Sequence, residues 1–260
     1  HHVVRLDYDQ AISKLTLLKD RGEYKNTYFF SSFFKLEFKA DMIEWELESD
    51  SLDISILNAK NIVPALFESE EYFNPLRYKK MTGLYEFHPV RTAVEFARLV
   101  QSSEYNLLEM QEHFDIKPEL ARSAMLFLKQ NNYILFDEEN LQIKVLRKAF
   151  HYVMAYTKQK DFDNILISSL NPKGSNASLN FETGEMVVKG VSRIVVTPDE
   201  DVRITPDSSR ITLLKDKDIK FSGGVNAGDF SYQGKDFFFN YDEYLIQMPV
   251  IDSMRIQVDF

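Results

Sequence analysis

Hydrophobic and polar residues alternate along segments near both ends of the chain. Residues 42–56 place Ile43, Trp45 and Leu47 on one face and glutamates on the other. This period of two is that of a half-buried β-strand, because successive side chains of a strand point to opposite faces. Short apolar runs bounded by turn residues predict further strands near residues 178–181, 186–188, 192–196, 219–221, 230–232 and 237–239.

The middle of the chain follows a different period. Residues 89–102 repeat apolar positions three and four residues apart, and Pro89 stands where the first turn would begin. This spacing is typical of an amphipathic helix with proline in its first turn. The same pattern predicts helices over residues 106–114, 117–131 and 144–158, and turn residues indicate linkers near 58–88 and 170–177.

A segment near the start of the chain recurs near its end. Residues 13–20 read SKLTLLKD and residues 209–216 read SRITLLKD, which gives six identities and two conservative replacements in eight positions. A Val-Arg-Leu triplet at residues 4–6 precedes the first copy, and a Val-Arg-Ile triplet at residues 202–204 precedes the second. Self-similarity of this kind indicates an internal duplication.

These patterns together predict an α+β fold. Two related β-rich units, built like a β-solenoid or a sandwich, would flank an inserted helical domain. His1 and His2 are typical of the remnant of a purification tag, which indicates a segment taken from a longer protein. The predicted parts are residues 1–2 for the tag remnant, 3–62 for the first β unit, 63–170 for the helical domain and 171–260 for the second β unit, a repeat of the first.

The helical segment carries a helix-turn-helix followed by a hairpin. Residues 106–116 and 117–128 supply two helices, and residues 133–145 supply two strands joined by an acidic turn. This order resembles that of winged-helix domains over residues 88–147, about 60 of the 260 residues. Where such families commonly have Gly before the wing, this chain has Asn132, which also tolerates a left-handed backbone.

The winged-helix resemblance implies a second helix placed in the DNA major groove, with Lys117, Arg122, Ser123 and Lys129 toward the DNA. The charges of this segment favour another use. Residues 90–150 hold eight basic and nine acidic residues, a net charge of 8 − 9 = −1, and the wing tip is acidic. DNA affinity comes from a positive surplus, so we do not expect a nucleic-acid partner.

Winged helices also serve as protein-interaction modules. Leu126 and Phe127 lie where a free recognition helix usually carries polar residues, and they are typical of packing positions. We therefore interpret this helix as a contact surface within the protein or with another protein. The candidate interaction residues are Lys117, Arg122, Leu126 and Lys129.

The residue types that carry catalysis or metal binding form no recognisable motif. Beyond the first two residues the histidines are His88, His113 and His151, which match neither a nucleophile motif nor a compact zinc pattern. Gly223 and Gly228 have the spacing of a phosphate loop, but Asp229 stands where lysine is required, so they predict a turn. We predict no catalytic, cofactor-binding or metal-binding residue, and no cofactor.

One acidic cluster leaves an alternative open. Glu44, Glu46, Glu48 and Asp50 line one face of a predicted strand. Paired carboxylates can bind a cation or act in glycoside hydrolysis, although a solvated face is the simpler interpretation. Aromatic groups such as residues 28–30 and 237–239 favour core packing, with a sugar-stacking or docking surface as the alternative.

Composition narrows the class of partner. The net charge of −9 disfavours nucleic acid and anionic membranes, no apolar run is long enough to insert into a membrane, and the absence of cysteine excludes disulfides and thiolate chemistry. The β segments, such as residues 213–216 and 234–239, loosely resemble those of large uncharacterised exported proteins of Bacteroidota. The resemblance implies an extracytoplasmic location.

The sequence therefore predicts a non-enzymatic structural or protein-interaction module of a larger, exported protein. Its partners would be neighbouring modules of the same chain or another protein. Two alternatives remain: a cytoplasmic winged-helix regulator that binds nucleic acid, and a carbohydrate-binding or carbohydrate-active β-solenoid.

Overall fold

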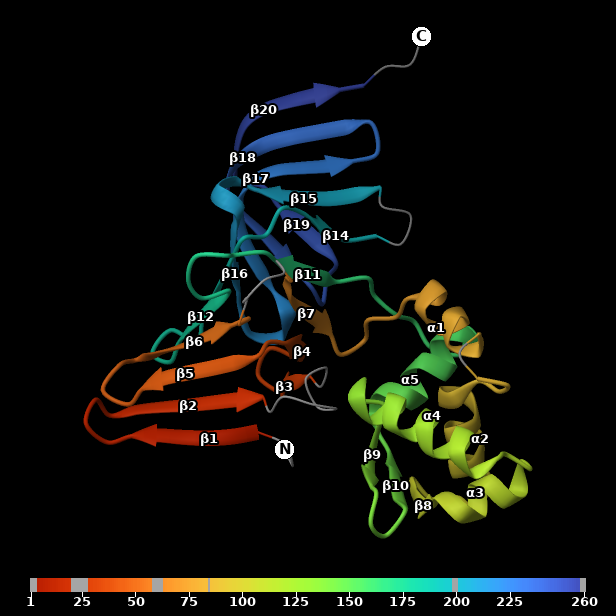
Figure 1. Ribbon diagram of the computed structural model, residues 1–260. Coiled ribbons are helices and arrows are strands. Elements are labelled where there is room, and N and C mark those ends of the chain that lie inside the picture. Colours follow the sequence, from red (N-terminus) through yellow and green to blue (C-terminus); the bar gives the residue numbers. More distant parts are fainter. Residues whose placement is uncertain (1–3, 20–27, 58–62, 84, 198–200, 258–260) are drawn as a thin grey trace. The chain divides into compact units, whose positions relative to one another are not determined.

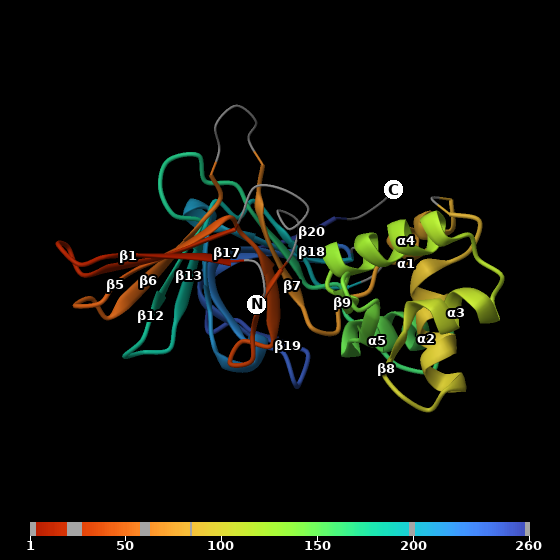
Figure 2. The same ribbon diagram turned by 60° about the horizontal axis from the view of Figure 1, so that its bottom comes forward.

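The computed structural model describes residues 4–19, 28–57, 63–83, 85–197 and 201–257 (Figures 1 and 2). These residues form two compact units. The β unit takes its described residues from 1–22, 29–70 and 163–260, and the helical unit takes its own from 23–28 and 71–162. Large open antiparallel sheets and five helices confirm the predicted α+β class.

The β unit is built around one long antiparallel sheet. Its strands follow a single path in which each strand is antiparallel to its neighbours: β1 (Val4–Asp9), β2 (Lys14–Lys19), β5 (Met42–Glu46), β6 (Ser51–Ser55), β12 (Ala177–Asn180), β13 (Met186–Lys189), β16 (Arg210–Leu213), β17 (Ile219–Ala227), β18 (Phe230–Asn240) and β20 (Val250–Ile256). Three more strands attach to this path: β15 (Val202–Pro206) to β17, β14 (Ile194–Val195) to β15 and β19 (Leu245–Gln247) to β18.

A smaller sheet packs against part of the long one. It contains β11 (Leu166–Ser169), β7 (Ala65–Ser69), β4 (Leu36–Lys39) and β3 (Phe29–Ser31), in that order. Apolar residues of both sheets form one buried core, in which Phe67 of β7, Ile54 of β6 and Phe237 of β18 are each no more than 1% exposed. Both sheets are antiparallel, and the finer choice between a sandwich-like and a solenoid-like form stays a prediction.

The core of the β unit also contains a buried polar cluster. The Asp163 carboxylate accepts hydrogen bonds from the Ser69 hydroxyl, at 2.6 Å, and from the Tyr241 hydroxyl. The buried Lys217 ammonium lies 3.5 Å from the centroid of the Tyr241 ring. Because buried polar groups are costly unless paired, these contacts hold Ser69 of β7, in the small sheet, to Tyr241, which directly follows β18 of the long sheet.

The duplicated segments share local structure but not strand pairing. Each forms a strand, a turn with a left-handed serine (Ser13 or Ser209) and a second strand. β1 and β2 pair with each other as a hairpin, whereas β15 and β16 both pair with β17 and not with each other. β6 also pairs with β12, so strands of both predicted β units lie in one sheet. The duplication stays a prediction.

The helical unit contains the predicted helices and hairpin in the predicted order. Its elements are α1 (Pro75–Thr82), α2 (Pro89–Leu99), β8 (Glu104–Asn106), α3 (Leu107–His113), α4 (Pro118–Gln130), β9 (Ile134–Asp137), β10 (Gln142–Val145) and α5 (Arg147–Tyr156). Helix α1 lies in the segment 58–88 that is predicted as a linker, and the sequence does not predict strand β8. Proline occupies the first turn of α1, α2 and α4, where its missing N–H costs no hydrogen bond. Within the described residues, no helix has the length and hydropathy that crossing a membrane requires.

The β-strands and helices of this unit close around a second core. Met110, Met125 and Leu128 of α3 and α4 are fully buried together with Tyr133 and Tyr152. Asn132 has a φ of 61°, which confirms the left-handed position expected at the start of the hairpin. β10 pairs with both β9 and β8.

Candidate functional site

Two of the cationic residues predicted on α4, Arg122 and Lys129, contact the hairpin beside it. Glu138, in the turn between β9 and β10, accepts a hydrogen bond from the Lys129 ammonium at 2.9 Å and lies 3.4 Å from the Arg122 guanidinium. The hydrogen bond from Lys129 holds the pKa of Glu138 below its usual value. The structure thus brings Arg122 and Lys129 together, but around a carboxylate that offsets part of their positive charge.

The other two predicted residues lie on different parts of α4. Leu126 is half-buried and packs against the core of the helical unit, as its apolar character suggested. Lys117 is exposed at the start of the helix, beside a surface hollow that includes Leu108 and Ile116. On a further side of α4, the Tyr85 hydroxyl donates to the Ser123 carbonyl at 3.3 Å.

Each histidine of the helical unit has a structural contact. His88 caps α2, because its Nδ1 accepts a hydrogen bond from the Arg91 amide at 3.3 Å. His113 packs beside the ring of Phe114, and the buried His151 has its Nε2 2.8 Å from the Glu71 carbonyl oxygen. In the described residues, no group of three His, Cys, Asp or Glu side chains could hold a metal ion.

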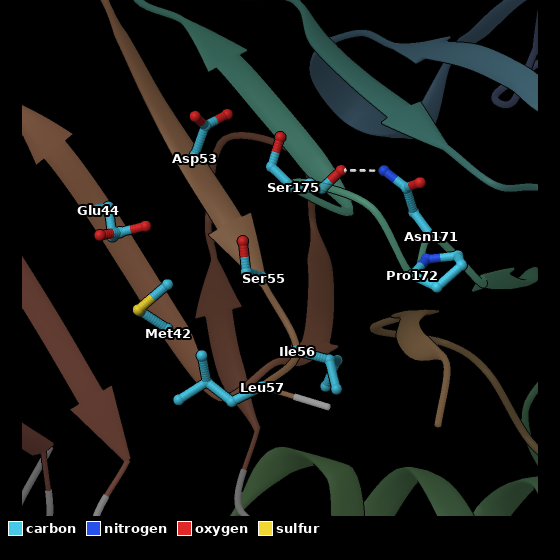
Figure 3. Close-up of a pocket in the computed structure, with 10 residues that line it drawn as sticks. Met42, Glu44, Asp53, Ser55, Ile56, Leu57, Asn171, Pro172 and Ser175 are labelled. Carbon is cyan, nitrogen blue, oxygen red and sulfur yellow. Dashed lines mark hydrogen bonds between the residues drawn. The ribbon is translucent and has the colours of Figure 1, made fainter. Parts of the chain in front are cut away.

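The predicted acidic cluster does not line one strand, because residues 42–56 form a hairpin whose turn contains Glu48 and Asp50; Glu44 of the cluster borders a hollow on the polar face of the long sheet (Figure 3). Its volume is about 320 Å³, and its carboxylates are Glu44 of β5 and Asp53 of β6, which are directly opposite each other. The Glu44 carboxylate lies 2.5 Å from the Lys14 ammonium. The remaining lining residues are Met42, Ser55, Ile56, Leu57, Asn171, Pro172, Gly174 and Ser175.

This hollow lacks the parts that glycoside chemistry would need. Of the described residues that line it, none is aromatic and able to stack against a sugar, and Glu46 is not among them. The Asn171 side chain donates to the Ser175 carbonyl at 2.7 Å, which stabilises the loop at its rim (Figure 3). The arrangement fits the interpretation of a solvated acidic face.

The glycine-rich segment forms the predicted turn. Gly228 lies between β17 and β18 with a φ of 55°, a conformation that glycine adopts without strain. Asp229 is exposed in the same turn, and strand β18, not a helix, follows it. A phosphate loop needs a helix at that point, so no phosphate site forms here.

The opposite face of the long sheet carries two continuous rows of apolar residues. The strand registers place Leu6, Leu17, Ile43 and Ile54 side by side across β1, β2, β5 and β6, and Tyr8, Leu15, Trp45 and Leu52 form the neighbouring row. From β6 the rows run on into the buried core through Ala177, Val188, Ile211, Leu179, Met186 and Leu213.

Burial along these rows falls steeply toward β1. Ile54 is 1% exposed, whereas Leu6 is 61% and Tyr8 is 52% exposed. Trp45 lies between the two extremes, half-buried and with its ring 5.3 Å from that of Phe181. The face that forms the core therefore continues onto β1, where side chains such as Leu6 and Tyr8 are exposed.

The same change occurs at the other end of the sheet. Ile204 of β15 and Val225 of β17 are buried, and the registers continue their row through Tyr232 of β18 to Met254 of β20. Met254 is 54% exposed, and its neighbour Ile256 is 53% exposed. Every residue of β20 is exposed.

These two exposed ends are also the edges of the sheet. In the described part of the chain, β1 pairs only with β2, and β20 pairs only with β18. Their outer edges therefore present backbone groups that are available to another strand. The sequence predicts neither strand individually; residues 4–9 alternate in polarity, but the pattern is too short to distinguish an edge strand from an interior one.

A half-buried lysine lies near the first of these ends. Lys19, the last residue of β2, has its ammonium 4.4 Å from the centroid of the Phe29 ring, and burial lowers its pKa to about 8.

No family model, curated protein or solved structure matches the chain.

Proposed function

We propose that this chain is a non-enzymatic scaffold module that binds protein partners through the two ends of its long sheet. The observation that carries the proposal is the apolar face, which runs out of the core onto Leu6 and Tyr8 at one edge and onto Met254 and Ile256 at the other. These side chains gain nothing from exposure to water, so a partner that covers them stabilises the complex.

Two features of each end favour a protein partner. An unpaired strand edge offers a row of amide and carbonyl groups that an extended segment can match, and the alternate apolar side chains supply the contact area. Both features coincide on β1 and on β20. Neither depends on a catalytic group.

The charges of the helical unit support the same proposal over nucleic-acid binding. The Lys129 ammonium and the Arg122 guanidinium both lie against the Glu138 carboxylate. Transferring them to phosphates would leave that carboxylate beside the nucleic acid, which opposes binding.

Site-specific photo-cross-linking in cells tests the proposal. A benzophenone amino acid would replace Tyr8 on β1, Met254 on β20, or Leu76 on α1; Leu76 is 68% exposed and serves as the control. We expect protein adducts at Tyr8 and Met254 in at least several-fold excess over Leu76. Adducts that are absent at both edge positions, or equally abundant at Leu76, would contradict the proposal.

A further inference from the structure

The two edges of the long sheet are complementary to each other. Starting at β1, each strand of the path runs antiparallel to the one before, and β20 is the tenth strand. An even number of alternating strands leaves β20 antiparallel to β1. A second copy in the same orientation could therefore follow β20 with its own β1 and continue the antiparallel order (Figure 1).

The apolar faces also match under this arrangement. Leu6 and Tyr8 lie on the face of β1 that continues into the core, and Met254 and Ile256 lie on the corresponding face of β20. Adding β1 of one copy to β20 of another places these residues on the same side. The apolar face would then be continuous from one copy to the next.

Charge and apolar contacts together favour one register for this pairing. With Leu6 opposite Ile256 and Tyr8 opposite Met254, Asp7 lies opposite Arg255 on the other face, where its carboxylate also accepts a hydrogen bond from Arg5 at 2.9 Å. A shift of two residues in one direction would put Arg5 opposite Arg255, and like charges directly opposite each other are unfavourable. A shift of two in the other direction puts Asp9 opposite Arg255, but within the described residues it leaves only one apolar pair, Tyr8 with Ile256, where the inferred register has two.

We infer that copies of this chain assemble head to tail, with β20 of one copy adding antiparallel to β1 of the next in the register that pairs Asp7 with Arg255. The inference rests on the proposed function and names its partner as a second copy. The contact joins two different surfaces, so it does not close on itself as a two-fold dimer does. It produces open oligomers whose length grows with concentration.

Engineered cysteines test the register, because the chain has no cysteine of its own. In the inferred pairing the β-carbons of residues 8 and 254 are about 5 Å apart, close to disulfide distance. Under mild oxidation the double variant Tyr8→Cys, Met254→Cys should give a ladder of covalent oligomers. The variant Leu6→Cys, Met254→Cys, whose cysteines would lie diagonally at about 7–8 Å, should cross-link several-fold less.

Charge reversal supplies a second measurement that uses no cysteine. In sedimentation velocity, Asp7→Arg or Arg255→Asp alone should weaken self-association several-fold, and the two together should restore it. Asp161→Arg and Arg98→Asp, exposed residues of the helical unit, serve as matched controls that leave it unchanged.

Three results would overturn the inference: a monomer at every concentration, with no ladder from the double-cysteine variant; equal ladders from both cysteine pairs; or no rescue by the double charge reversal. If the purified chain is monomeric while Tyr8 still cross-links to a different protein in cells, the second copy is wrong as partner and the proposed function stands. If neither experiment gives adducts, both fail.

Discussion

At the scale of single residues, His88 links the fold of the helical unit to pH. Its Nδ1 accepts from the Arg91 amide at the start of α2, which leaves Nε2 to donate to the Tyr78 carbonyl, 3.0 Å away. The ring also lies against Tyr78, with centroids 4.0 Å apart. Burial lowers the pKa of His88, because the charged imidazolium is poorly solvated there, and protonation of Nδ1 would also remove the cap.

This arrangement predicts acid sensitivity. Since the pKa of His88 is lower in the folded than in the unfolded chain, the unfolded chain binds more protons below about pH 6.5, the unperturbed value, and the free energy of unfolding falls as pH drops through the folded pKa. His88→Asn keeps a capping side chain without the titration. We expect the variant to lose less stability than the wild type, by about 1 kcal/mol, between pH 7.5 and 5.

Circular dichroism at 222 nm, followed during urea unfolding at both pH values, measures this difference. His113→Asn is the matched control, because His113 caps no helix, and it should keep the wild-type loss on acidification. An equal loss in the wild type and in His88→Asn would show that His88 has no part in the acid sensitivity.

At the scale of elements, sequence reasoning succeeded where structure is local. The helices of residues 89–99 and 118–130 follow from apolar spacing with proline in the first turn, and the hairpin after Asn132 follows from the residue types that favour left-handed backbone. The sequence shows that the turn containing Glu138 is acidic, but it does not show that this carboxylate contacts Arg122 and Lys129. Which cations Glu138 holds depends on how the β9–β10 hairpin packs beside α4, which no local pattern specifies.

The Glu138 contacts give a prediction about nucleic acid. Because Arg122 and Lys129 are held by this carboxylate, we expect no measurable binding of the full chain to a 20-base-pair duplex at about 150 mM salt. Fluorescence anisotropy at two salt concentrations is the measurement. Glu138→Gln should allow weak binding that salt abolishes, whereas Glu139→Gln, beside it in the turn between β9 and β10, should not.

Wild-type binding that is tight and falls steeply with salt would reverse this interpretation of α4. It would show that the contacts with Glu138 are exchanged for phosphates at little cost.

At the scale of the whole molecule, the pairing of strands is what the sequence could not supply. The duplicated segments keep the same strand–turn–strand order. However, β1 and β2 pair with each other, whereas β15 and β16 each pair with β17. The partner of a strand is decided by residues far along the chain, such as Ile54 of β6 opposite Ala177 of β12. For the same reason, alternating residues 4–9 did not reveal that β1 is an edge.

The central claim is that the two ends of the apolar face serve contact with partners and not the folded core. The free energy of unfolding of the double variant Leu6→Lys, Tyr8→Lys tests it most directly, with Ile54→Ala, in the same row but 1% exposed, as the comparison. We predict a change of no more than about 0.5 kcal/mol for the double variant and a loss of about 2–5 kcal/mol for Ile54→Ala. A loss in the double variant as large as that of Ile54→Ala would contradict the account.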